Sequence, residues 1–66
     1  MEQIATITFE DLDSGNQGAF LVRASPRVIC LGVTVRTGGD IDVVLCAGAA
    51  RQLVDALNRA IASSEQ

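Results

Sequence analysis

The stretch RVICLGVTVRTGGDIDVVLC, residues 27–46, decides the fold that this chain can adopt. Two runs rich in β-branched residues, 27–37 and 40–46, flank the glycines Gly38 and Gly39. Such runs are typical of strands, and glycines between them suit the backbone of a tight turn. The stretch therefore predicts a β-hairpin.

The side chains of this hairpin also predict its register. A three-residue loop, 37–39, gives these pairs: Arg36 with Asp40, Val35 with Ile41, Val33 with Val43, and Leu31 with Leu45. A two-residue loop would instead set Val35 against Asp42. We expect the three-residue loop, because it matches charges and apolar side chains at once. Cys30 and Cys46 then lie directly opposite each other.

Two further strands are predicted before the hairpin. Residues 3–9 are rich in β-branched side chains with partial alternation, and residues 19–25 form a second run that ends at Pro26. The segment 10–18 between them collects acids, Ser, Asn and two glycines, which is typical of a loop. Gly32, inside the third strand, indicates a bulge or a close approach by another backbone.

From residue 49 to residue 62 the period changes from two to 3.6, which predicts a helix. Its apolar stripe comprises Ala50, Leu53, Val54, Leu57, Ala60 and Ile61. The order is ββββα, so we expect a single α+β domain over residues 1–66. It would be a four-stranded antiparallel sheet with one C-terminal helix packed on one face. This order of elements along the chain is compatible with a meander and with a rearranged strand order in the sheet.

Composition limits the classes of function. A chain of 66 residues buries only about 60% of its unfolded surface, so we expect self-association to supplement its core. The net charge of −3 disfavours direct nucleic-acid binding. The sequence has neither the pattern of a signal peptide nor an apolar run long enough to cross a membrane. We expect a soluble cytoplasmic protein with reduced thiols.

The face of the sheet opposite the helix is not clearly polar. We expect it to form a homodimer or partner interface, since small soluble monomers rarely expose such a patch. The interface residues that we predict are Ile4, Leu21, Val28, Cys30, Gly32, Val44 and Cys46.

The two cysteines are the main candidates for chemistry. A thiol nucleophile normally needs a nearby base, the chain has no histidine, and Cys46 is expected to precede the first helical turn. We therefore predict no catalytic residue, no cofactor and no metal ligand, and interpret Cys46 as a small apolar residue. A Cys30–Cys46 disulfide and half of an intersubunit metal site are the alternatives.

The remaining polar candidates are weaker. Arg23, Arg27 and Arg36 are candidates for a small basic patch, with ordinary surface charge as the alternative. The acids of the 10–18 loop do not have the spacing of a calcium-binding EF-hand, which favours a solvated turn.

The segment GDIDVVLCAGAARQLVDALNRAIA, residues 39–62, resembles the ends of many small uncharacterised bacterial and phage proteins, in which a strand precedes a helix of the form A-R-x-L-x-x-A-L. In that group the position of Cys46 often carries Ser or Thr as a helix cap. The resemblance implies a small sheet-and-helix domain and, for phage members, binding and inhibition of host machinery.

The function that we expect is therefore binding of another protein without catalysis. The chain would act as a homodimer, and a phage- or prophage-encoded inhibitor is one form of this hypothesis. The alternatives are a structural or assembly subunit of a larger particle, or a small-molecule or metal-binding regulator that uses the two cysteines.

Overall fold

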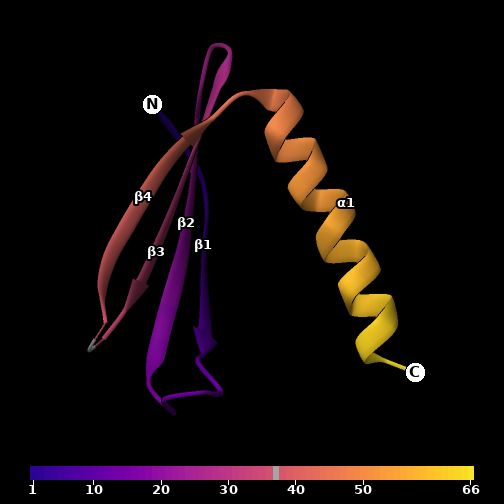
Figure 1. The fold of residues 1–66 in the computed structure, drawn as a ribbon. Helices are drawn as coiled ribbons and strands as arrows, with labels where there is room; N and C mark the ends of the chain where they lie inside the picture. The colour runs from indigo at the N-terminus through magenta and orange to yellow at the C-terminus, as the bar shows by residue number, and fades with distance from the viewer. Residues whose placement is uncertain (37) are drawn as a thin grey trace.

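The computed structural model describes residues 1–36 and 38–66. The predicted elements are all present along the chain (Figure 1). They are β1 (Glu2–Glu10), β2 (Gln17–Ser25), β3 (Val28–Val35), β4 (Gly39–Leu45) and α1 (Ala47–Ser64).

The strands form one antiparallel sheet in the order β1-β2-β3-β4. This meander settles the strand order that the sequence left open, and with α1 packed on the sheet it confirms the predicted α+β class. A bulge between Gln3 and Ala5 interrupts the pairing of β1 with β2 and contains Ile4. The pairing of β3 with both of its neighbours is regular.

The predicted register of the β3–β4 hairpin is wrong by two residues. Val35 pairs with Gly39 and Val33 pairs with Ile41. The Gly38 amide donates a hydrogen bond of 3.0 Å to the Val35 carbonyl, and Gly39 adopts a φ of 84°. Glycine takes this left-handed conformation at little cost. Gly39 can therefore be the first residue of β4 and pair with Val35, where the predicted register placed Gly39 in the loop. Thr37 of the predicted loop lies outside the described residues.

The shift is an even number of residues, so the faces of the sheet are those predicted. Ile7, Phe20, Val33 and Ile41 are successive cross-strand partners on one face. We call this face the ladder; it carries Ala5, Ile7, Phe9, Phe20, Val22, Ile29, Leu31, Val33, Val35, Ile41, Val43 and Leu45. The rings of Phe9 and Phe20 stack on it with centroids 4.6 Å apart.

Helix α1 leaves the end of β4 and inclines away from the strands (Figure 1). It begins at Ala47, two residues before the predicted start, because Cys46 caps it. It contacts β3 and β4, and among its described residues only Ala49 and Ala50 are half-buried while the others are exposed. The helix therefore packs on the sheet through its first turn alone.

The molecule is open for its size. Its radius of gyration is 13.1 Å, against about 11 Å for a compact domain of this length. Its accessible surface is 5215 Å², whereas a compact monomer of 6.9 kDa exposes roughly 4,000 Å². Among the described residues, only Cys30 and Gly32 are buried. A single copy therefore encloses very little core.

Candidate functional site

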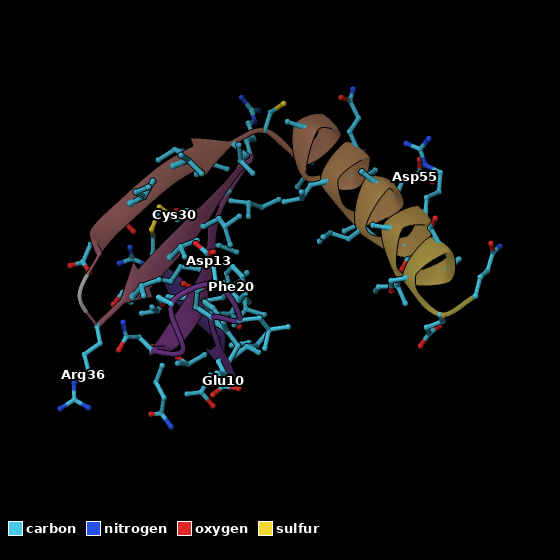
Figure 2. All side chains as sticks on the ribbon, turned by 60° about the horizontal axis from the view of Figure 1, so that its bottom comes forward. Glu10, Asp13, Phe20, Cys30, Arg36 and Asp55 are labelled. Atoms are coloured by element: carbon cyan, nitrogen blue, oxygen red, sulfur yellow. The ribbon has the colours of Figure 1, made fainter. Side chains whose placement is uncertain are left out.

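The candidate site is the face of the sheet opposite the ladder, which we call the second face. It carries Gln3, Thr6, Thr8, Glu10, Gln17, Ala19, Leu21, Arg23, Ser25, Val28, Cys30, Gly32, Thr34, Asp40, Asp42 and Val44. The predicted interface residues Leu21, Val28, Cys30, Gly32 and Val44 therefore share one face. Figure 2 shows Cys30 between β4 and β3. Among the described elements, α1 contacts only β3 and β4, and Val44 on this face is 63% exposed.

The middle of the second face is polar and is built around Gly32. Leu21 and Asp42 flank Gly32 on the neighbouring strands. A Cβ atom at position 32 would lie 2.6 Å from Oδ1 of Asp42. The Asp42 side chain thus approaches Gly32 closely, and the predicted bulge is wrong, because the pairing of β3 is regular at this position.

The absence of a side chain at Gly32 lets a charge pair cross β3. Nη2 of Arg23, on β2, lies 3.9 Å from Oδ1 of Asp42, on β4. The Nε atom of Arg23 is buried and has no hydrogen-bond partner within the described part of the chain. The second face therefore presents a partly satisfied guanidinium group beside the carboxylate of Asp42.

Two shallow depressions accompany this surface. One, of about 210 Å³, lies over the charge pair and is lined by Leu21, Arg23, Gly32, Val33, Thr34, Asp40 and Asp42. The other, of about 430 Å³, lies at the strand ends and is lined by Met1, Glu2, Ala24, Ser25 and Pro26. The first is smaller than the ~300 Å³ at which ligand pockets begin. It suits a projecting side chain better than a whole ligand.

Apolar side chains border the charge pair on the side toward the start of β3, while Thr34 and Asp40 border it on the other side. Cys30 is 7% exposed and pairs with Val44, whose side chain is 63% exposed. Leu21 and Val28 are half-buried. A charge pair beside exposed apolar side chains is a surface that a protein partner can cover.

The remaining predicted interface residues, Ile4 and Cys46, lie apart from this group. Ile4 is in the bulge of β1 and is 55% exposed. Cys46 follows the end of β4 and is not opposite Cys30, so the predicted pairing of the two cysteines is wrong because of the register shift. Both cysteines are free thiols.

Cys46 precedes the helix, as expected, but it adjoins the first helical residue, Ala47, where three intervening residues were expected. Cys46 is the N-cap residue, and its Sγ accepts a hydrogen bond of 3.5 Å from the Ala49 amide. Sulfur accepts weakly, yet the geometry is that of a Ser or Thr cap. The thiol therefore occupies the place of the hydroxyl in a Ser or Thr N-cap.

The three arginines of the predicted basic patch are not gathered together. Arg23 pairs with Asp42, Arg27 lies in the β2–β3 turn, and Arg36 lies beyond the other end of β3. Figure 2 shows Arg36 projecting from the tip of the β3–β4 hairpin. Ordinary surface charge describes Arg27 and Arg36.

The acidic loop between β1 and β2 is held by its own hydrogen bonds. The Asp11 carboxylate accepts from Ser14 Oγ at 2.7 Å and from the Asp13 amide at 3.2 Å. The Ser14 hydroxyl, and then the Asp13 amide, hold the pKa of the Asp11 carboxyl below its usual value. The loop forms a solvated turn, as predicted.

Sequence reasoning missed two features of the molecule. Asp42 was not recognised as the partner of Arg23, although it has the same strand parity as Val44. The apolar stripe of α1 was expected to be covered by the sheet, yet Leu57 and Ile61 are each 52% exposed. Neither feature could be found without knowing the true register and the inclination of the helix.

Within residues 1–36 and 38–66, no three metal-ligating side chains of His, Cys, Asp or Glu are grouped together. No helix in these segments is both long and apolar enough to cross a membrane. No family model, no curated protein and no solved structure matches the chain.

Proposed function

We propose that this chain is a non-catalytic binding protein that acts, as a homodimer, by covering a surface of another protein with its second face. One observation carries the proposal: among the described residues no element covers the second face, where apolar side chains lie exposed beside a charge pair. Val44, which is 63% exposed, lies beside the buried Cys30 on this face.

The chemistry of the second face indicates the kind of partner. Arg23 retains donors beyond the one that faces Asp42, and its Nε atom lacks a partner among the described residues. A carboxylate or carbonyl group that enters the depression over Gly32 would accept from this guanidinium. Apolar side chains on the partner would then cover Leu21, Val28 and Val44.

The resemblance of residues 39–62 to phage proteins supports a specific form of the proposal, in which the partner belongs to host machinery and the protein inhibits it. Such a protein would act in the cytoplasm, where its two free thiols stay reduced.

A pulldown from the native host tests the proposal. We expect the tagged wild-type chain to capture a specific protein that binds again when purified. The Val44→Glu variant should lose it, because a charge would enter the apolar contact. The control, Gln52→Glu, adds the same charge to the exposed outer side of α1 and should retain the partner.

Circular dichroism should show that both variants fold, since Val44 and Gln52 are exposed in the single chain. Capture that survives Val44→Glu would contradict the proposed surface. Recovery of the chain as a fixed fraction of a large particle would instead support the assembly-subunit alternative.

A further inference from the structure

The apolar stripe of α1 faces the sheet but remains exposed. Figure 2 shows Asp55 on the side of α1 away from the strands. Leu57 follows Asp55 by two residues, about 200° around the helix, so it lies on the side toward the sheet. Even so, Val54, Leu57 and Ile61 are 59%, 52% and 52% exposed.

The ladder opposite this stripe is exposed as well. Ile7, Val43 and Ile41 are 52%, 40% and 67% exposed. Among the described residues, α1 contacts β3 and β4 alone, so no helix in this part of the chain lies over the β1 and β2 part of the ladder. The stripe of α1 and the ladder of the same chain therefore face each other but are not packed together.

We propose that a second copy of this chain covers both surfaces, with the stripe of each α1 packed on the ladder of the other copy. A two-fold axis perpendicular to the sheet leaves both stripes facing the plane of the two ladders. The inclined helix can thus lie on the neighbouring sheet without turning its charged side inward. The contact is isologous, because the same patch is used on both copies.

The lengths of the elements suit this exchange. The 18 residues of α1 span about 27 Å at 1.5 Å each. The 8 residues of β3 span about 27 Å at 3.4 Å each. A helix from one copy therefore covers the neighbouring strands from end to end.

The surface area supports a second copy as the occupant. The chain exposes 5215 Å², about 1,200 Å² more than a compact monomer of its mass. Burial of that excess on two copies removes about 2,400 Å², which lies within the range of obligate homodimers. A chain with so little core needs a partner that covers its exposed ladder and helix stripe. A second copy of the same chain meets this need without any other protein.

This dimer uses the ladder and the stripe, and therefore differs from the predicted dimer on the second face. It leaves the second face free for the proposed partner. The two proposals are consequently tested by different variants.

The first test is the mass and melting behaviour of the wild-type full chain. We expect light scattering at micromolar concentration to give twice 6.9 kDa, and the melting temperature to rise with protein concentration. A monomer that unfolds cooperatively at a temperature independent of concentration would overturn the proposal.

The second test locates the interface. Leu57→Ala should raise the dimer dissociation constant about a thousandfold, because each two-fold dimer loses two buried leucine side chains. Leu57→Glu should abolish the dimer, while Gln52→Glu and the second-face variant Val44→Glu should leave it intact. If Leu57→Glu does not fold, the dimer dissociation constant of Leu57→Ala still shows whether Leu57 lies in the interface.

A dimer that is lost in Val44→Glu and unaffected by Leu57→Ala would place the interface on the second face and refute this proposal. Loss of partner capture in Val44→Glu with an intact dimer would support both proposals at once. Loss of the dimer in Leu57→Ala with capture unaffected by Val44→Glu would support this one and contradict the proposed function.

Discussion

Oδ1 of Asp42 lies 3.9 Å from Nη2 of Arg23, although the strands that carry them are not neighbours in the sheet. The contact crosses β3 above Gly32, where any Cβ atom would obstruct it. The side chains of Arg23 and Asp42 are 39% and 64% exposed, so water screens the pair. The ion pair therefore fixes the positions of the Arg23 and Asp42 side chains on the second face but adds little to the stability of the fold.

Asp42→Asn should lower the free energy of unfolding by about 0.5 kcal/mol or less, because exposed ion pairs contribute little. The difference should disappear in 1 M salt, which screens the attraction. Urea unfolding at one protein concentration, in low and high salt, measures both values. Asp40→Asn removes the same charge from the same strand and serves as control; an equal salt-dependent loss there would argue against a specific pair.

Gly18→Ala should destabilise the sheet by about 1–3 kcal/mol through overpacking. The added Cβ would lie 2.6 Å from Cζ of Phe9 and 2.8 Å from the carbonyl oxygen of Thr34. Neither the stacked ring nor the backbone of β3 can move freely. Thermal unfolding measures the loss.

The same substitution in the helix provides the matched control. At Gly48 a new Cβ would lie 3.9 Å from Sγ of Cys46, an ordinary van der Waals distance. Gly48→Ala should therefore stabilise by up to about 1 kcal/mol through helix propensity. If both variants changed stability equally, packing at Gly18 would not be the cause.

Arg27→Gly should stabilise the protein by about 0.5–1 kcal/mol. Arg27 has a φ of 71°, a left-handed conformation that is unfavourable for a residue with a Cβ atom. Glycine removes this strain, and its greater freedom in the unfolded chain offsets part of the gain. The melting temperature should increase for Arg27→Gly. It should not increase for Arg36→Gly, the control in the turn at the other end of β3.

Ser14→Ala should raise the pKa of the Asp11 carboxyl toward its usual value. The Ser14 hydroxyl donates to the ionised carboxylate and lowers that pKa more than the Asp13 amide does. The folded pKa is lowered, so the associated stability is present above the unfolded pKa. It is lost as the pH falls through the folded pKa.

A carboxyl NMR titration of the wild type, Ser14→Ala and the control Ser63→Ala measures this pKa. An Asp11 titration unchanged in Ser14→Ala would show that the hydroxyl does not hold the carboxylate.

The elements of the fold could be predicted from the sequence because each has its own periodicity. The period of two in 27–37 and 40–46 marks strands, and the period of 3.6 after residue 49 marks the helix. The faces were also predictable, since parity survives an even shift of register. Gly38 and Gly39 both suit a turn, however, and only the observed φ of Gly39 shows which of them rejoins the strand.

The candidate site was predictable only in part. Parity places Leu21, Cys30 and Val44 on one face without any coordinates. The pairing of Arg23 with Asp42 depends on a side chain that crosses β3, and strand patterns contain no such information. The apolar periodicity of the helix begins only at residue 49, so it could not show that Cys46 is the N-cap residue.

The connection between sheet and helix consists of one residue, since β4 ends at Leu45 and α1 begins at Ala47. One residue contributes only two soft torsions, and these direct a helix about 27 Å long. A longer linker after Cys46, such as three inserted glycines, would let the helix turn back onto its own ladder. Light scattering on that chain should then give the monomer mass. The length of the connection between β4 and α1 would thus determine the number of subunits, because the same stripe would pack on the same ladder within one copy or between two.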